Sequence, residues 1–321
     1  MAAASVQPGG KACGLIVFLG ETADFMSRLT ANFLLLLAAA LWGGAFVAQA
    51  QSAAYLSAGW YTGLRFLLAF LAVLPLGVAE ARRAGSFLAG LGGIVPLGVV
   101  FAVSSLLQQW ALELTSVTHA GFLTGLYVIF VPVLEVVFFR RAPHPLVWLA
   151  TVLALAGTWF LGGGFYSLSR GDLLVIISAL GFAVQILLVQ HVVRGTGRPV
   201  AAALGQSLAC MVLGSAVGGA LPHWHAVASC LPQLLYGGII SGGLAFLLQA
   251  ICQRHTGATD TAVILMTEAL FAALFAAIIL HERMSHTGWL GCALLFGALV
   301  LAQIGPVLLP RRVVNNGFPT G

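Results

Sequence analysis

A carboxylate lies inside an apolar stretch that is long enough to cross a membrane. Between Thr261 and Leu280, Glu268 is the only charged residue. An apolar run of about 20 residues spans the hydrocarbon core of a bilayer, and a carboxylate near its middle is costly unless it faces protein or water. We therefore expect Glu268 to face the interior, where it contacts a substrate amine or carries a proton. The alternative is a structural carboxylate that is hydrogen-bonded to neighbouring helices.

Two further charges lie within or near apolar runs. Arg65 is roughly 10 Å from the nearer end of segment 58–79, taking the rise of an α-helix. We expect a structural or gating ion pair there in preference to contact with a substrate carboxylate. Glu135 lies near the end of segment 118–139, beside Arg140 and Arg141. It is predicted to be a solvated or paired carboxylate, in the same gating or ion-pair group as Arg65.

Amides and aromatic residues recur within the apolar segments. A buried amide must find hydrogen-bonding partners, so these side chains are expected to face the interior. Trp42, Ala45 and Gln49 share one helical face. The lining of a water-accessible cavity explains such a set, and hydrogen bonds between helices are the alternative. The candidate substrate-cavity residues are Trp42, Gln49, Gln108, Trp110, Tyr127, Gln185, Gln249 and Glu268.

The composition excludes an ordinary soluble domain. Hydrophobic residues make up 60% of the 321 residues, charged residues only 7%, and the mean hydropathy is +1.03. Soluble domains carry about 25% charged residues. The net charge of +5 comes from basic residues at the ends of apolar runs, where they set membrane orientation. We therefore expect an all-α integral membrane protein, a monomer whose partners are the lipid bilayer and a small molecule, with no nucleic acid.

Ten apolar segments follow one another after residue 29, joined by short links. Most basic residues fall on the side of residue 29, so both termini are expected in the cytoplasm, with the chain in the inner membrane. The predicted division is a cytoplasmic segment 1–29, a five-helix repeat 30–165, a second five-helix repeat 171–309 and a cytoplasmic tail 310–321. The ten segments are 30–50, 58–79, 87–112, 118–139, 145–165, 171–192, 199–221, 231–255, 259–280 and 286–309.

The second half of the chain repeats features of the first half at a constant distance in the sequence. A shift of 141 in the numbering brings Gln108 onto Gln249 and Trp148 onto Trp289, with similar lengths of span and link between them. An odd number of spans per repeat inverts the second repeat relative to the first, which is a common plan of secondary transporters with a central substrate cavity.

Four short motifs follow one another along the chain: Leu-Trp-Gly at 41–43, Leu-Arg-Phe at 64–66, Thr-Glu-Ala-Leu-Phe at 267–271 and His-Glu-Arg at 281–283. In their order and spacing, the chain resembles the EamA family of the drug/metabolite transporter superfamily. The likeness extends from about residue 30 to residue 309. Arg140-Arg141 stands where the second repeat has His281-Glu282, so the Glu-Arg ending occurs only once.

The resemblance implies ten transmembrane helices as two inverted five-helix repeats around a central cavity. It also implies export of small metabolites, most often amino acids, and the aromatic amino-acid exporters of the YddG type are the nearest subgroup. One arginine and one glutamate suit a zwitterion, because its carboxylate and ammonium need one partner each. The alternatives are export of cationic drugs or of another metabolite.

Other classes of function find little support in the sequence. We find no nucleophile with a base, no paired acids and no filter sequence of the kind that an intramembrane enzyme or a channel needs. His223 and His225 lack a third ligand nearby, the five cysteines are scattered, and no phosphate-binding loop occurs. We therefore expect no enzyme activity, no metal and no cofactor.

Overall fold

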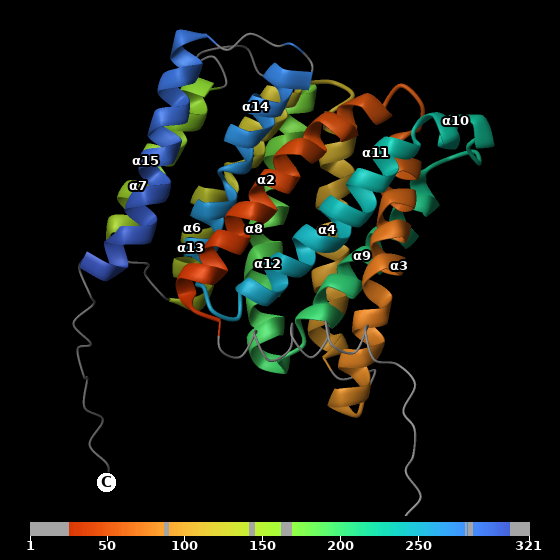
Figure 1. Cartoon of the computed structure of the whole chain (residues 1–321), viewed down its shortest axis with the longest axis horizontal. Helices are drawn as coiled ribbons and strands as arrows, with labels where there is room; N and C mark the ends of the chain where they lie inside the picture. The colour runs from red at the N-terminus through yellow and green to blue at the C-terminus, as the bar shows by residue number, and fades with distance from the viewer. Residues whose placement is uncertain are drawn as a thin grey trace, which may run out of the picture.

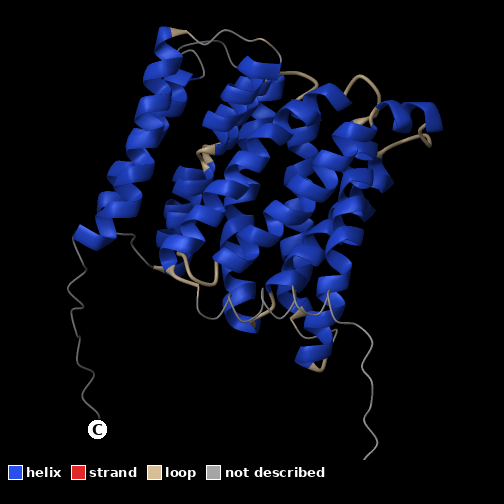
Figure 2. Cartoon of the chain, viewed as in Figure 1, coloured by secondary structure: helices blue, strands red, loops and turns tan. Residues whose placement is uncertain are grey.

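The computed structural model describes residues 26–86, 90–140, 145–161, 169–279, 281 and 285–308. Arg141, Glu282 and Arg283, and the tail 310–321, lie outside these residues, as does 1–25 of the N-terminal segment. The described part of the chain is helical and contains no strand (Figure 2). A helix satisfies its own backbone hydrogen bonds, which lipid cannot do, so an apolar chain of this kind folds into helices.

Eight segments of the described chain are long and apolar enough to cross a membrane. Two more apolar helices, α7 (Pro145–Leu161) and α15 (His286–Leu308), have shorter apolar stretches within the described residues. A short helix, α10 (Trp224–Ser229), lies between spans. The eight segments are α2 (Arg28–Ser52), α3 (Ala58–Ala84), α4 (Leu91–Ala111), α5 (Val117–Thr124) with α6 (Tyr127–Phe139), α8 (Arg170–Thr196), α9 (Pro199–Val217), α11 (Leu231–Leu235) with η1 (Tyr236–Ala245) and α12 (Phe246–Cys252), and α13 (Ala258–Leu265) with α14 (Glu268–Ile279).

Serine side chains fix where the first helix of each half begins. The Ser27 hydroxyl accepts a hydrogen bond from the Thr30 amide at the start of α2. At the start of α8, Ser169 and Asp172 form a capping box, in which each side chain accepts from the other residue's backbone amide. Such caps satisfy amides that have no partner inside the helix.

Two predicted spans are broken in the middle. Segments 118–139 and 259–280 were each expected to be one helix, but each is two helices separated by two turn residues, 125–126 and 266–267. At the second break, the Thr267 hydroxyl donates to the Ile264 carbonyl oxygen at 2.7 Å and so satisfies a carbonyl near the end of α13. Each break places the first residue of a new helix, Tyr127 or Glu268, deep inside the bundle.

The two halves match in length and in packing. The first residues of α5, α6 and α7 coincide with those of α13, α14 and α15 under the same shift of 141 in the numbering. The helices also pack in a way that both halves share. Helix α3 packs on its counterpart α9, and α7 packs on its counterpart α15. The contact between α4 and α8 corresponds to the contact between α12 and α2. In Figure 1, α7 and α15 stand together at one edge of the bundle, and α3 and α9 lie near the opposite edge.

One span departs from α-helical geometry. The segment η1 is a ten-residue π-helix, in which each amide bonds the carbonyl five residues back. It packs closely on α3: a Cβ added at Gly238 would lie 2.7 Å from both the Arg65 carbonyl oxygen and Leu68 Cβ. The glycines between 237 and 243 leave room for this close approach of the two backbones.

Candidate functional site

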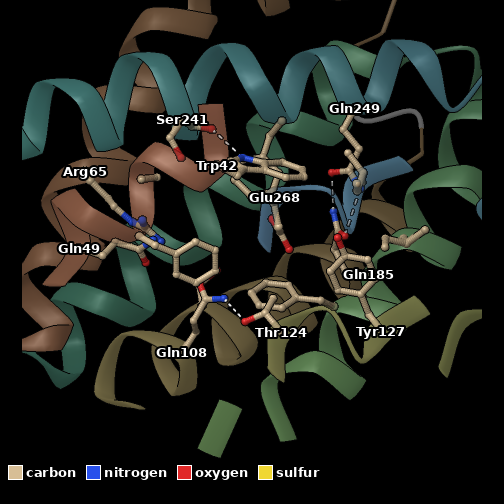
Figure 3. A pocket seen from close by; sticks show the side chains of 17 residues that line it. Trp42, Gln49, Arg65, Gln108, Thr124, Tyr127, Gln185, Ser241, Gln249 and Glu268 are labelled. Carbon is tan, nitrogen blue, oxygen red and sulfur yellow. Dashed lines mark hydrogen bonds between the residues drawn. The ribbon is translucent and has the colours of Figure 1, made fainter. Parts of the chain in front are cut away.

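A cavity opens where the broken spans meet the other helices (Figure 3). Both halves contribute to its walls, through α2, α3, α4, α5, α6, α8, η1, α12, α13 and α14. Seven of the eight candidate cavity residues named from the sequence line it. The lining residues are Trp42, Ala45, Phe46, Gln49, Arg65, Ser105, Gln108, Thr124, Tyr127, Phe182, Gln185, Ile186, Ser241, Phe246, Gln249, Leu265 and Glu268.

Glu268 is the one carboxylate among the lining residues that the structure describes. It is buried, with 4% of its surface exposed, and its Oε1 has no hydrogen-bond partner in the described residues. It stands in the first turn of α14, where the partial positive charge of a helix start stabilises a carboxylate. Tyr127 holds the equivalent position in α6, faces the same cavity and also has an unpartnered hydroxyl. Glu268 therefore offers an unused acceptor to the cavity.

Arg65 supplies the positive charge of the cavity. Its side chain is 4% exposed, and its guanidinium carbon lies 4.7 Å from the centre of the Phe66 ring and 5.5 Å from that of Tyr61. The ion pair expected from the sequence is absent among the described residues, where no carboxylate lies within salt-bridge distance. Stacking on aromatic rings replaces it, since a guanidinium is weakly hydrated and is attracted to ring faces. The Nε of Arg65 remains without a hydrogen-bond partner.

Three glutamines form a hydrogen-bonded network on another wall. Gln185 Nε2 donates to Gln206 Oε1 at 2.6 Å and to Gln249 Oε1 at 3.2 Å. Gln249 Nε2 donates back to Gln185 Oε1 at 3.4 Å. Across the cavity, Gln108 Nε2 donates to the Thr124 hydroxyl at 3.0 Å. These glutamines therefore line the cavity and also form hydrogen bonds between helices.

Trp42 and Gln49 both line the cavity from α2. Trp42 Nε1 donates to the Ser241 carbonyl oxygen on η1 at 3.2 Å, which ties α2 to the π-helix. Gln49 is 3% exposed, and its Oε1 has no partner in the described residues. Figure 3 shows Arg65 and Gln49 on one side of the cavity, Gln185 and Gln249 on the other, and Glu268 between them.

Trp110 corrects one of the candidate assignments. It does not line the cavity, and 37% of its surface is exposed. The physical reason is helical phase: Gln108 faces the cavity, and a residue two positions further along points about 200° away. A tryptophan within an apolar segment thus faces outward here.

Glu135 also lies away from the cavity. It accepts a hydrogen bond from the Thr259 hydroxyl and so ties α6 to the first turn of α13. On the same face of the bundle, an Arg28 Nη2 to Asp260 Oδ2 ion pair of 2.5 Å ties α2 to α13. Glu135 thus contributes to contacts near helix ends, and the gating or ion-pair role expected for it stays a prediction.

Several lining residues were not named from the sequence. They are small polar or apolar residues that an apolar helix contains anywhere, and only packing brings them to the cavity. For Ser105 and Phe246, the usable signal was their position three residues before Gln108 and Gln249, on the same helical faces. The unnamed lining residues are Phe46, Ser105, Thr124, Phe182, Ile186, Ser241, Phe246 and Leu265.

In the described ranges, no three histidine, cysteine, aspartate or glutamate side chains gather in a way that could hold a metal ion. The cavity lining presents one cation, one carboxylate, amides and aromatic rings. These groups can recognise a small polar or amphipathic molecule by charge pairing, hydrogen bonds and stacking.

Comparison with known proteins agrees with the fold and with the duplication. An "Uncharacterized transporter" of Archaeoglobus fulgidus is 26% identical over 283 residues, which is 88% of each chain. The "Uncharacterized transporter YwfM" of Bacillus subtilis strain 168 is 27% identical over 221 residues, 66% of this chain and 74% of that one. A solved crystal structure that is 20% identical in sequence matches the fold with a TM-score of 0.71, covering 89% of this chain and all of that one.

The model of the EamA-like transporter family matches twice, at residues 29–163 and 169–303. The two matches cover the described spans except the first residue of α2 and the last five residues of α15, and they divide the chain between α7 and α8. With two copies of this domain, this multi-pass membrane protein belongs to the EamA-like transporter family.

Proposed function

We propose that this chain is a secondary transporter that exports small zwitterionic metabolites, namely amino acids with uncharged side chains, aromatic ones included, across the inner membrane. One observation carries the proposal: Arg65 and Glu268 line the same cavity, both are buried, and neither forms an ion pair within the described residues. An amino acid would bring a carboxylate to Arg65 and an ammonium group to Glu268. Each charge would then be paired inside the membrane, where unpaired charge is costly.

We infer alternating access from the way that the cavity is built. Apart from α3, the helices that line it come in equivalent pairs from the two repeats, so exchanging the conformations of the repeats would move the opening from one face to the other. Five spans in each repeat would insert the second repeat upside down, with both termini in the cytoplasm. The first helix begins and the last helix ends at the same end of the bundle in Figure 1, which supports placing both termini on the same side of the membrane.

An alternative substrate class has one observation in its favour. Trp42, Phe182 and Phe246 line the cavity together with Glu268, and aromatic rings beside a carboxylate suit a lipophilic cation. Arg65 weighs against it, because a bound cation would be repelled by an unpaired guanidinium in the same cavity. Uptake measurements separate the two classes.

The test is counterflow into liposomes that contain the purified protein and are preloaded with unlabelled amino acid. We expect saturable uptake of labelled phenylalanine, threonine or methionine, and its loss in the variants Glu268→Gln and Arg65→Gln. The matched control is Glu135→Gln, which removes a carboxylate outside the cavity and is expected to keep uptake. If no amino acid is taken up, the proposal fails, and uptake of a labelled organic cation instead would establish the alternative.

A further inference from the structure

The two repeats place different chemistry at equivalent positions beside the cavity. Arg65 is the eighth residue of α3, and Gln206 is the eighth residue of α9, which packs on α3. The shift that relates these two positions also relates Gln108 to Gln249, and there the residues are identical. The first repeat therefore presents a cation where the second presents a neutral amide.

Gln206 is occupied with holding another side chain. It is 1% exposed, its Oε1 accepts from Gln185 Nε2 at 2.6 Å, and its Nε2 donates to the Ala202 carbonyl oxygen at 3.2 Å. It is not itself among the lining residues. Gln206 thus fixes the position of Gln185, which does line the cavity.

The wall formed by Gln185 and Gln249 is polar but carries no charge. Both N–H groups of Gln185 are used, one by Gln206 and one by Gln249, and Gln249 returns a bond to Gln185. What remains for a solute is one N–H of Gln249 and free lone pairs on the amide oxygens. Such a wall can bind a hydroxyl or an amide group, but it cannot neutralise a second charge.

Aromatic rings complete this part of the cavity. Phe182 and Phe246 are lining residues, and each packs on Phe101, with ring centroids 6.1 and 4.6 Å apart. A ring with neighbours on its outer side keeps its place when a solute packs on its inner side. Amides and rings together suit an uncharged side chain.

We infer that Gln185 and Gln249, held in place by Gln206, form the subsite for the side chain of the substrate and exclude solutes that carry a third charge. The inference rests on the proposed function, in which Arg65 and Glu268 pair the two charges common to all amino acids. A lysine-like or glutamate-like side chain would bring another charge to a neutral wall inside the membrane. That charge would remain unpaired, and the free energy of binding would be unfavourable.

The test measures preference for charge in counterflow, as the ratio of charged to uncharged amino acid taken up. The wild type is expected to take up threonine or phenylalanine and to exclude lysine and glutamate. Gln185→Glu has nearly the same shape and adds a carboxylate, so we expect the lysine to threonine ratio to rise about tenfold. Gln185→Lys is expected to raise the glutamate ratio instead, and Gln185→Glu alone carries the test if the lysine variant does not fold.

Two controls separate selectivity from stability. Gln253→Glu also adds a carboxylate at a buried amide, but Gln253 bonds the Ile186 carbonyl oxygen and does not line the cavity, so its ratios are expected to match the wild type. Gln206→Leu removes the support of Gln185. It is expected to raise the KM for threonine without changing either ratio, as suits a positioning residue.

Each outcome decides the inference. Wild-type uptake of lysine or glutamate at the rate of threonine, or unchanged ratios in a Gln185→Glu protein that still transports threonine, would overturn it and leave the proposed function standing. A wild type that takes up none of these amino acids refutes the proposed function and the inference together.

Discussion

At matching positions in the two repeats, α6 begins with Tyr127 and α14 begins with Glu268, while position 119 in α5 is a histidine and position 260 in α13 is an aspartate. The helix starts coincide when the repeats are aligned, yet the side chains at these starts differ in charge. The repeats therefore share helix lengths and breaks, whereas the carboxylates at these positions occur only in the second repeat. A substrate whose two ends differ in charge has one preferred orientation in such a cavity.

The backbones of two equivalent spans differ as well. Leu91–Ala111 of the first repeat is the α-helix α4, whereas the matching span of the second repeat contains the π-helix η1. Glycines at 237, 238, 242 and 243 let η1 lie against α3, where Arg65 projects into the cavity. The second repeat thus combines the carboxylate of the cavity with the irregular span.

The largest difference in transport between the repeats is expected for variants at the first residues of α14 and α6. Glu268→Gln is expected to lower the counterflow rate at least about tenfold, because the charge that would pair with the substrate amine is removed. Tyr127→Phe, the equivalent change in the first repeat, is expected to lower it only a few-fold, since it removes a hydroxyl near Glu268 but no charge. Equal losses in the two variants would show that the repeats contribute alike.

The close contact of η1 with α3 predicts a loss of stability. In Gly238→Ala, the new Cβ would lie 2.7 Å from backbone and side-chain atoms of α3, and we expect a loss of about 1–3 kcal/mol in the free energy of unfolding. Gly92→Ala in α4 is the matched control, because a Cβ there meets nothing within 4 Å. Thermal unfolding in detergent compares the two variants, and similar midpoints would argue against tight packing of η1.

A smaller loss in the free energy of unfolding is expected when Asp172, at the start of α8, is changed. Its carboxylate accepts from the Thr115 hydroxyl at 2.7 Å and from the Ser169 amide at 2.8 Å. Asp172→Asn replaces one accepting oxygen with a donor, so we expect a loss of about 1 kcal/mol. Thermal unfolding in detergent measures this loss, and Ser169→Ala is a second variant that weakens the same capping box.

The smallest effect is expected at the opposite face, where Arg28 pairs with Asp260. The side chains are 49% and 23% exposed, so solvent and salt screen the pair. Asp260→Asn is expected to change the free energy of unfolding by about 0.5 kcal/mol at low salt and less at high salt. A larger loss in the free energy of unfolding for Asp260→Asn than for Asp172→Asn would contradict this expectation.

The amide and carboxylate positions of the cavity could be predicted from the sequence for a physical reason. A polar group inside an apolar span must turn away from lipid, so Gln185, Gln249 and Glu268 were expected at an interior surface. The constant shift between the repeats likewise gave the pairing of Gln108 with Gln249. These inferences need only local composition and spacing.

Other features depend on packing that no local pattern records. Serine, threonine and phenylalanine occur on every face of an apolar helix, so Thr124 and Phe182 could not be singled out. Trp110 was misassigned because the inward phase of α4 was unknown. The partner of Arg65 was also misjudged, since aromatic rings close in space replace a carboxylate. No local pattern in the sequence predicted the π-helical hydrogen-bond spacing of η1.

The π-helix also determines which changes of chain length this span tolerates. Removing one residue from an α-helix rotates everything that follows by about 100° around the axis. A π-helix holds about one extra residue in each turn, and ten residues make about two turns, so losing two residues between Tyr236 and Ala245 lets the segment rewind as an α-helix while α12 nearly keeps its orientation. Helix α4 contains no π-helical turn, so the same deletion before Gln108 would turn this side chain away from the cavity.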